Sequence, residues 1–492
     1  MISIERPEDI NWINLYWIVY QREPVELGDA LLAQVDAGQQ RFNALIERGI
    51  PCYGVTTSFG KLVEIEPGHE AEREIIRNTL RERASAFGEP LPRPAARAML
   101  VLRLVNFLTG RDGVSSNLCR FLVGRLNDDF VPWVPILGHG MAADASANSH
   151  AFQILVGQGH VMTRKGKRKS AAKALRKREI EPFTVNRREA LALVNGIAAA
   201  PALAFDAWQV LDGLYRFANL VAAISIDGIA APRDAIDPAV ASVSNAAGVG
   251  RVIDALRKHL NHSQIQPFKL QAPVSYRVVP QVHGAFADAM ARFKQEIENC
   301  FTDFSDNPML EEERFLSVGL FHNQHLVNQA EQVALALAHI GCLSERRLHR
   351  LLDPAMSGLN AQLAQQPGID VGLVTTQKAC IDLAARLRLQ AQPVSLYTSE
   401  TSAGQEDYMS LAIPTLARLY EMTELCRAML AYEMLAGITA IRLRGQIPGD
   451  DVAEVDRLMA ESLPQTQDLS PGQLVEQMLE NLKQGWLAGV LQ

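Results

Sequence analysis

Three polar residues stand in sequence settings that could support chemistry. Tyr53 lies in a Gly-rich polar loop, residues 53–60, where a phenol can serve as a general acid or base. Asn195 follows a run of apolar residues, and a buried amide needs hydrogen-bond partners, either in a helix turn or in a ligand. Arg277 lies just before an expected helix, where a guanidinium can clamp a carboxylate or another anion through two hydrogen bonds. Each signal is weak by itself, because packed loop tyrosines and capping amides are common.

Two short polar segments have the composition of turns and helix caps. Residues 305–308 (Ser-Asp-Asn-Pro) form a capping and turn cluster, which is most often structural. Residues 402–407 (Ser-Ala-Gly-Gln-Glu-Asp) are typical of a loop that enters a helix, with acids near its positive N-terminal end. Within this loop Gln405 could orient polar groups. Glu406, or Asp144 elsewhere in the chain, could supply a second group for proton transfer.

Long helices are expected to position these residues. Proline is costly inside a helix, so Pro-free stretches limit where long helices can lie. Such stretches are residues 95–131, 202–231, 309–353 and 415–447. Apolar residues in 282–304 recur at steps of three and four, and residues 326–352 and 371–389 are also helical in pattern. Because alternating β-branched runs are scarce, the sequence predicts an all-α protein with helices buried in a central bundle or subunit interface.

Eight motifs occur in a fixed order between residues 27 and 444. They are 53–60 (YGVTTSFG), 104–114 (LVNFLTGRDGV), 191–196 (LALVNG), 280–284 (PQVHG), 305–308 (SDNP), 321–322 (FH), 344–347 (SERR) and 402–407 (SAGQED). In these motifs the chain resembles the aromatic amino-acid ammonia-lyase family, the histidine and phenylalanine ammonia-lyases.

The resemblance implies an architecture and an assembly. The fold would be an all-α subunit with a long central helical bundle, as in the fumarase/aspartase superfamily. The chain would form a single domain over 1–492, in which 1–200 carry active-site loops and 201–492 form the bundle and the C-terminal helices. Family subunits usually form a homotetramer whose active sites draw loops from several subunits and act on small molecules.

The family's electrophile is not matched. It is a methylidene-imidazolone prosthetic group made from an internal Ala-Ser-Gly, and the corresponding segment here is 138–150 (GHGMAADASANSH). Aligned on Gly138 and Asp144, the triad becomes Ala142-Ala143 followed directly by the aspartate, and Ala143 has no hydroxyl to lose as water. The segment 145–147 (Ala-Ser-Ala) could in principle cyclise instead, in a shifted register. We expect a divergent member that lacks the group, and hence no cofactor.

Several functional positions of the family are kept, and others differ. The family's Ser-His substrate-selectivity pair falls on Glu82 and Arg83, which puts charge where an imidazole or an aromatic ring would be bound. The family's tyrosine before its Ser-Leu-Arg falls on Val274, which leaves Tyr276 as a substitute. The expected catalytic residues are Tyr53, Asn195, Tyr276, Arg277, Phe321, Gln405 and Glu406. The expected substrate-binding residues are Glu82, Arg83 and Asp144.

Three functions from different classes follow. The first is an enzyme of ammonia-lyase fold that catalyses an elimination, addition or isomerisation on an anionic or carrier-bound substrate without the prosthetic group. The second is a working ammonia-lyase or aminomutase that forms the group from residues 145–147. The third is a non-catalytic binding or scaffold protein in a biosynthetic pathway.

Charge is distributed unevenly along the chain. The 48 basic and 55 acidic residues give a net charge of −7, yet residues 163–178 (TRKGKRKSAAKALRKR) hold nine basic residues and no acid. The remainder therefore sums to −16 (39 − 55), which argues against nucleic-acid binding, since that requires a broad basic face. The basic segment, residues 164–178, is either a solvated surface loop or a docking patch for an acidic protein partner or a phosphate-bearing group.

The remaining composition predicts a cytoplasmic protein. The six cysteines are dispersed with no CxxC pair, which argues against a zinc site or a disulfide framework and favours a reducing compartment. Residues 1–10 carry four charges, which a secretory signal would not tolerate, and no apolar run is long enough to span a bilayer. We therefore expect neither a nucleic-acid partner nor a membrane.

Overall fold

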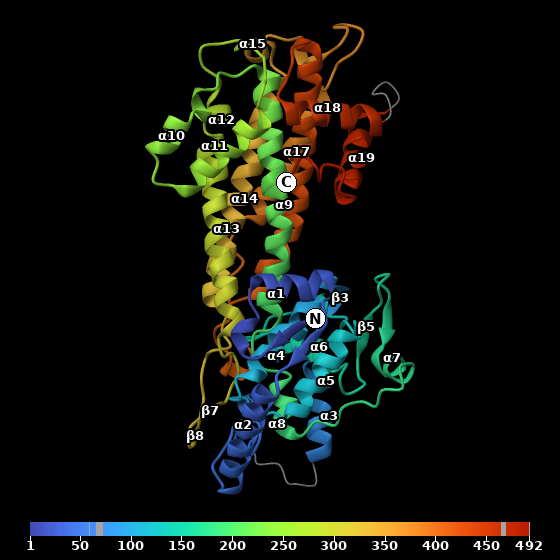
Figure 1. Ribbon diagram of the computed structural model, residues 1–492, viewed down its shortest axis with the longest axis vertical. Helices are drawn as coiled ribbons and strands as arrows, with labels where there is room; N and C mark the ends of the chain where they lie inside the picture. Colours follow the sequence, from blue (N-terminus) through green and yellow to red (C-terminus); the bar gives the residue numbers. More distant parts are fainter. Residues whose placement is uncertain (59, 65–71, 464–468, 492) are drawn as a thin grey trace. The chain divides into compact units, whose positions relative to one another are not determined.

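A computed structural model describes residues 1–58, 60–64, 72–463 and 469–491, and it is mostly helical (Figure 1). The all-α prediction is confirmed. The helices are α1 (Trp12–Tyr16), α2 (Asp29–Glu47), α3 (Glu72–Arg83), α4 (Arg93–Leu108), α5 (Ser116–Asn127), α6 (Ala145–Phe152), α7 (Ala171–Arg176), α8 (Arg187–Ala192), α9 (Ala199–Ile229), α10 (Pro238–Ser242), α11 (Ala247–His259), α12 (Val274–Arg277), α13 (Val279–Thr302), α14 (Gln324–Leu351), α15 (Pro354–Ser357), α16 (Val374–Gln390), α17 (Ala412–Arg444), α18 (Asp450–Ser462) and α19 (Pro471–Lys483).

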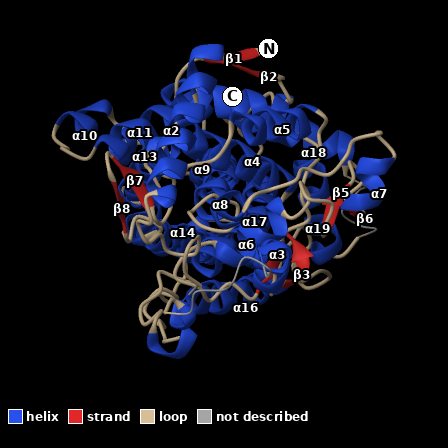
Figure 2. Ribbon diagram, turned by 90° about the horizontal axis from the view of Figure 1, so that it is seen from below, coloured by secondary structure: helices blue, strands red, loops and turns tan. Residues whose placement is uncertain are grey.

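Strands are short and occur in pairs (Figure 2). The pairs are β1 (Ile2–Ile4) with β2 (Val25–Leu27), β3 (Phe87–Pro90) with β4 (Pro135–Leu137), β5 (His160–Met162) with β6 (Arg168–Ser170), and β7 (Met309–Glu311) with β8 (Arg314–Leu316). The first pair is parallel and the other three are antiparallel. Strands of three or four residues are too short to show clearly the alternating pattern from which a strand is predicted.

Proline marks the beginning of three long helices. Pro201 is the third residue of α9, Pro280 the second of α13 and Pro414 the third of α17. The N–H groups of a first helical turn have no intrahelical acceptor, so a proline there costs no hydrogen bond. Each of these helices therefore begins slightly before the Pro-free or periodic stretch from which it was predicted.

The chain forms two compact units. Unit 1 comprises Met1–Ala207, Lys294–Ala330 and Pro393–Ala417, and unit 2 comprises Trp208–Phe293, Glu331–Gln392 and Arg418–Gln492. In unit 1, loops from the middle and the C-terminal half of the chain pack with the N-terminal part. Segments far apart in the sequence therefore meet in one unit, and this is where most of the predicted site residues lie. The single domain over 1–492 stays a prediction.

Segments of four long helices form the core of unit 2 (Figure 1). Arg347 of α14 forms an ion pair with Glu433 of α17 at 2.6 Å, and both side chains are fully buried. The hydroxyl of Ser225 on α9 donates to the same carboxylate at 2.5 Å. His283 of α13 hydrogen-bonds Asn219 of α9 at 2.8 Å. These polar contacts fix the relative register of the four segments within an otherwise apolar core.

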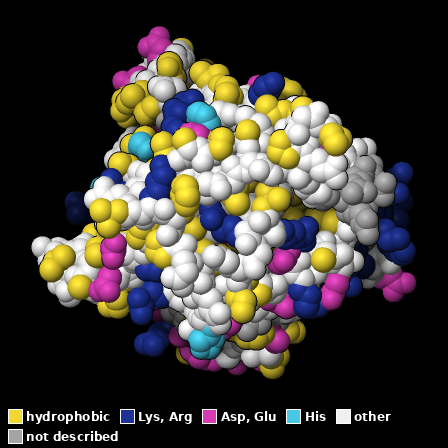
Figure 3. Space-filling model, turned by 90° about the horizontal axis from the view of Figure 1, so that it is seen from above, with side chains coloured by type: hydrophobic (Ala, Val, Ile, Leu, Met, Phe, Trp, Pro, Cys, Tyr) yellow, Lys and Arg dark blue, Asp and Glu magenta, His cyan; other side chains and the backbone are white. Residues whose placement is uncertain are grey.

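The surface of unit 2 carries exposed apolar side chains. Figure 3 shows apolar side chains among basic and acidic ones on the face seen from above. The most exposed apolar side chains of unit 2 are those of Val243, Leu270, Ile369, Val371 and Leu389. The homotetramer stays a prediction. None of the described helices combines the length and hydropathy that crossing a membrane requires.

Candidate active site

The loop that carries Tyr53 folds on itself. The N–H groups of Val55, Thr56 and Thr57 donate to the carbonyl oxygen of Cys52 at 2.9 to 3.4 Å. The N–H of Gly60 donates to the hydroxyl oxygen of Tyr53 at 2.9 Å. These bonds hold the half-buried phenol in one orientation. Phe59, which belongs to the same motif, lies outside the described residues.

Arg83 lies at the C-terminal end of α3, close to Tyr53. Burial lowers the pKa of the Arg83 guanidinium, while Tyr53, Glu82 and Glu406 act in the opposite direction. The guanidinium therefore lies within electrostatic range of both Tyr53 and the loop that carries Glu406. Glu82 differs from its neighbour: its side chain is 59% exposed and lies 3.6 Å from the guanidinium of Arg81. Arg83, one of the two residues predicted to replace the family's selectivity pair, is thus within electrostatic range of Tyr53 and Glu406.

Glu406 connects its own loop to the segment 138–150. The hydroxyl of Ser402 donates to one carboxylate oxygen at 3.0 Å, and the N–H of Ala142 donates to the other at 3.1 Å. Ser402 and Ala403 have φ values of 55° and 53°, a left-handed conformation that costs a non-glycine residue of order 1–3 kcal/mol. Strain of this kind clusters at functional sites. Gln405 is exposed.

The acids of this loop do not lie at a helix N-terminus, contrary to the prediction from their sequence. Residues Ser402–Gly404 form a single 3-10 turn, and Thr401 pairs with Glu406 in an isolated antiparallel bridge. The backbone therefore turns back on itself, and the following helix, α17, begins only at Ala412. The carboxylate of Glu406 is oriented by Ser402 and Ala142 rather than by a helix dipole.

Asp144 is buried at the beginning of two helices. Its backbone carbonyl accepts the first bond of α6, from the N–H of Asn148 at 2.8 Å. Its carboxylate instead faces α9, where the N–H of Ala200 donates to it at 2.7 Å, and the amide of Asn323 donates at 3.3 Å. Burial raises the pKa of Asp144 to about 7, although these hydrogen bonds act in the opposite direction. Asp144 is thus a carboxyl group that titrates near neutral pH.

The alternative triad, residues 145–147, lies inside α6. The side chains of Ser146 and Ala147 are buried, and the hydroxyl of Ser146 lies 3.3 Å from the hydroxyl of Ser85. An α-helical carbonyl accepts a hydrogen bond from the N–H four residues later. In this conformation the carbonyl of Ala145 is directed along the helix axis and away from the N–H of Ala147.

The turn that contains Asn195 is held by Asn148, which the sequence did not single out. The Asn195 amide donates to the carbonyl oxygen of Asn307 at 2.6 Å. The buried amide of Asn148 donates to the carbonyl oxygens of Val194, Asn195 and Gly196 at 3.0 to 3.1 Å. Asn148 lies one turn along α6 from Asp144, in a helix with small and polar residues that gave no periodic signal. Its amide explains how the Asn195 turn is positioned.

Four buried charges fix the loop 305–308. Asp306 accepts from Arg103 at 2.9 Å and from Arg188 at 2.7 Å, and Asp112 lies 3.5 Å from Arg103. All four side chains are at most 3% exposed. Burial and the neighbouring Asp306 raise the pKa of Asp112 well above its usual range. Burial opposes ionisation of Asp306 as well, but the two guanidinium groups hold its pKa below the usual value. We call these four residues the buried cluster.

Phe321 precedes α14 in a turn of unit 1. Its side chain is half-buried. The neighbouring His322 ring stacks on Tyr408, with centroids 5.9 Å apart and planes 23° apart. Burial lowers the pKa of His322. The turn before α14 therefore contacts the segment that follows the Glu406 loop.

Two predicted site residues belong to unit 2, whereas the other eight belong to unit 1. Tyr276 is 2% exposed, and its hydroxyl donates to the carbonyl oxygen of Arg347 at 2.9 Å. Burial raises the pKa of this phenol well above its usual range. Arg277 is exposed, and its Nε donates to the carbonyl oxygen of Ala272 at 3.0 Å. The catalytic roles of both residues stay predictions.

Comparison with known proteins is consistent with the motifs. A histidine ammonia-lyase of Burkholderia multivorans is 31% identical over 446 residues, which cover 88% of each chain. The structure of ergothionase, an ergothioneine-degrading enzyme from Treponema denticola, has a TM-score of 0.94 at 24% identity and covers 99% of each chain. The structure of histidine ammonia-lyase from Trypanosoma cruzi has a TM-score of 0.87 at 25% identity, covering 100% of this chain and 95% of that one.

The family model for aromatic amino acid lyases matches residues 12–463. This range includes every motif and every predicted site residue. The chain therefore belongs to the aromatic amino acid lyase family.

Proposed function

We propose that this chain is an enzyme that catalyses an elimination, addition or isomerisation on an anionic small molecule without a methylidene-imidazolone group. The observation that carries the proposal is the grouping of Tyr53, Arg83 and Glu406, which we call the site group. Glu406 is hydrogen-bonded to the segment in which Ala143 occupies the position of the family's serine. A polar site is retained beside a segment that lacks the residue needed to make the electrophile.

The geometry of residues 142–147 supports the absence of the group. Ala143 has no hydroxyl to eliminate. Cyclisation of 145–147 would require the nitrogen of Ala147 to attack the carbonyl carbon of Ala145, and both lie in α6. The first turn of this helix would have to unwind around a buried Ser146. The residues therefore do not fit the prosthetic group.

Tyr53 is the proposed general base. The N–H of Gly60 holds its ring in place. The guanidinium of Arg83 lies within electrostatic range of the phenol. A positioned base of this kind would take a proton from the carbon atom next to the one that bears the leaving group. Glu406 and Asp144 are candidates for the second proton transfer, and the pKa of about 7 suits Asp144 to that role.

The leaving group must depart without electrophilic activation. Ammonia is a poor leaving group, whereas a group that already carries a positive charge departs as a neutral molecule. Ergothionase, whose structure is similar, is an ergothioneine-degrading enzyme. Ergothioneine is therefore the first compound to test on this chain. Asn195 and Gln405 would orient the polar groups of the substrate, and an Arg277 from another subunit would bind its carboxylate or another anion, since family active sites draw loops from several subunits.

The experiment begins with ergothioneine, histidine, phenylalanine and tyrosine, and follows the ultraviolet absorbance of a conjugated product. On the substrate that is turned over, Tyr53→Phe should lower kcat by roughly 10²- to 10⁴-fold, the contribution of a general base. Arg277→Ala should raise KM. Tyr397→Phe is the control, because that ring is 76% exposed and outside the site group. If Tyr53→Phe and Arg277→Ala both match the wild type, the proposal is wrong.

A histidine ammonia-lyase or aminomutase that uses the prosthetic group is the second candidate. The histidine ammonia-lyase that is 31% identical over 88% of the chain favours it. The group would then come from residues 145–147, and its formation removes two water molecules from the chain. Intact mass spectrometry decides between the candidates: a mass two waters below that of the sequence supports the second candidate, and an unmodified mass excludes it.

A further inference from the structure

The basic segment 164–178 encloses one side of a cavity in unit 1. The cavity has a volume of about 380 Å³, near the lower end of the range of roughly 300–1,000 Å³ that is typical of small-molecule sites. Five basic side chains line it: Arg93, Arg164, Lys169, Lys177 and Arg178. They come from the beginning of α4, the β5–β6 hairpin and the end of α7. The cavity thus gathers cations from separate elements.

The carboxylates at this cavity are already paired. Asp129 forms ion pairs with Arg93 at 2.8 Å and with Arg164 at 3.0 Å. Asp128 forms an ion pair with Arg125 at 2.6 Å. The pairs at Asp129 also tie the turn of the β5–β6 hairpin to the beginning of α4. The acids therefore build one wall of the cavity and leave its remaining positive charge uncompensated.

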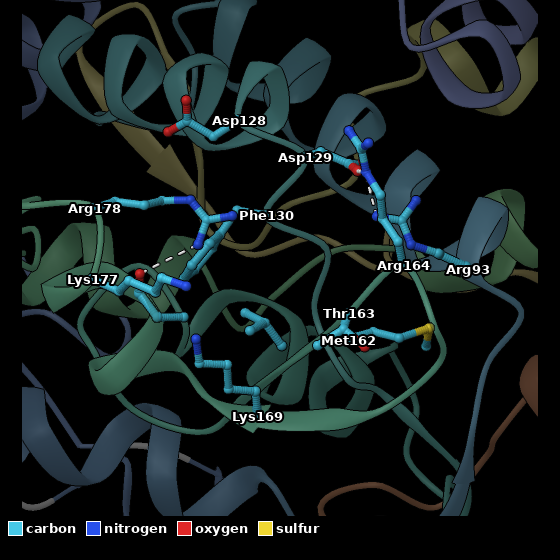
Figure 4. A pocket seen from close by; sticks show the side chains of 12 residues that line it. Arg93, Asp128, Asp129, Phe130, Met162, Thr163, Arg164, Lys169, Lys177 and Arg178 are labelled. Atoms are coloured by element: carbon cyan, nitrogen blue, oxygen red, sulfur yellow. Dashed lines mark hydrogen bonds and ion pairs between the residues drawn. The ribbon is translucent and has the colours of Figure 1, made fainter.

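Three basic side chains of the cavity have no carboxylate partner within 4.0 Å in the described part of the chain. These are Lys169, Lys177 and Arg178. Figure 4 shows them on one side of the cavity, opposite Asp129 with its two arginines. Arg178 lies over the ring of Phe130, 5.4 Å from the centroid. Lys177 and Arg178 follow the C-terminal end of α7, where basic side chains interact favourably with the helix dipole. This interaction does not explain the position of Lys169, which belongs to β6.

We propose that this cavity binds the phosphate group of a small organic molecule. A phosphate monoester carries up to two negative charges on three oxygens, so donors from several directions can contact it at once. A single carboxylate is planar and carries one charge, which would leave part of the positive charge uncompensated. The cavity is also lined by Phe130 and Met162, which can contact an apolar portion of the ligand. An acidic protein would instead engage the exposed lysines outside the cavity.

The binding test uses isothermal titration of the full chain at low salt with phenyl phosphate, orthophosphate and benzoate. We expect phenyl phosphate to bind most tightly, orthophosphate more weakly and benzoate least. Added salt should weaken phosphate binding, since the attraction is electrostatic. The proposal is overturned if phenyl phosphate produces no binding heat, or if benzoate binds as tightly as phenyl phosphate.

Two charge-matched double variants separate a cavity from a diffuse basic surface. Lys169→Ala with Lys177→Ala removes two cations of the cavity, and Lys165→Ala with Lys173→Ala removes two exposed cations outside it. The first pair should weaken phenyl phosphate binding by about ten-fold or more, because two charge-assisted hydrogen bonds are lost. The second should change it by less than about two-fold.

Two results of these binding measurements would overturn the proposal. Equal weakening by both pairs would overturn the proposal in favour of nonspecific attraction. Tighter binding of a tetraglutamate peptide than of phenyl phosphate, lost in the Lys165/Lys173 variant, would overturn it in favour of an acidic protein partner. Circular dichroism on both variants checks that the helices are intact. The elimination activity plays no part in this test, so its outcome is independent of the proposed function.

Discussion

Two groups of polar side chains in unit 1 contain arginine and carboxylate in proximity, and they differ in burial. The buried cluster, Arg103, Arg188, Asp112 and Asp306, is at most 3% exposed, and its two guanidinium groups share one carboxylate. The site group is half-buried, and its residues come from two loops and a helix end. A fully buried charge must be paired to be tolerated, whereas a half-buried one can exchange its protein partner for water or a ligand. The buried cluster is suited to holding the fold, and the site group to binding and proton transfer.

The largest effect should come from breaking the buried cluster. Asp306→Asn leaves Arg103 and Arg188 buried without their shared carboxylate, and we expect a loss of about 3–5 kcal/mol in the free energy of unfolding. Urea denaturation measures this. Asp303→Asn, the same change at an exposed position three residues earlier, should cost less than about 0.5 kcal/mol. A cost below about 1 kcal/mol for Asp306→Asn would remove the distinction between the two groups.

Asp144 should produce a pH-dependent effect of the next size. Its pKa is raised to about 7 in the folded chain and lies near 4 in the unfolded chain. Between these values the folded state binds more protons than the unfolded state, so the contribution of Asp144 to stability falls as pH rises from about 4 to about 7. Asp144→Asn removes this contribution.

Relative to the wild type, the stability of Asp144→Asn should therefore increase with pH across this window by of order one to a few kcal/mol. Thermal unfolding of both chains at pH 5, 6, 7 and 8 measures the difference. A constant difference across the series would mean that Asp144 does not titrate in this window. Asp254→Asn, the same change at an exposed aspartate of α11, serves as the control for a general charge effect.

Glu406→Gln should affect activity more than stability. The amide keeps one oxygen acceptor for Ser402 or Ala142, so unfolding should change by less than about 1 kcal/mol. The loss of negative charge beside Arg83 should lower the turnover of the identified substrate by roughly ten-fold or more. Denaturation and steady-state kinetics on the same preparation make the comparison. A stability loss as large as that of Asp306→Asn would show that Glu406, like the buried cluster, holds the fold.

Glu82→Gln should have the smallest effect of the series. The Glu82 side chain is 59% exposed and contacts only the adjacent Arg81 among the ion pairs of the described residues. Surface substitutions of this kind usually change stability by no more than about 0.5 kcal/mol. KM should also be unchanged, whereas Arg83→Gln should raise it. Equal effects of the two variants on KM would show that the charge pair, and not Arg83 alone, contacts the substrate.

Much of the fold followed from local pattern, and the boundaries depended on capping. The stretch 326–352 became α14 because apolar residues at helical spacing can be buried on one face. The beginnings of α9, α13 and α17 were displaced because proline is tolerated in a first turn. The loop 402–407 was predicted to enter a helix, yet positive φ values at Ser402 and Ala403 turn the backbone instead. Residues other than glycine rarely adopt this conformation, so their identity did not signal the turn.

The candidate site, like the fold, was predicted only in part from the sequence. Tyr53, Arg83 and Glu406 were selected from motif positions, and the structure places them in electrostatic contact. Asn148, Arg103 and Arg188 were not selected, because the type of a polar residue and its neighbours in sequence do not reveal which distant carbonyl or carboxylate it will meet. The partners of Asn148 lie 46 to 48 residues away, and the partner that Arg103 shares with Arg188 lies 203 residues from it.

By itself, the sequence determined that the chain is helical, that it has the motifs of its family, and that two alanines directly precede Asp144. These properties depend on residue type and short-range spacing, which the chain carries whether or not it is folded. Only the tertiary structure decided that Arg83 lies within electrostatic range of Tyr53, that Asp144 is buried enough to titrate near neutral pH, and that Lys169, Lys177 and Arg178 line one cavity. Burial and charge proximity depend on contacts between distant segments, because desolvation and Coulomb attraction act through space and not along the chain.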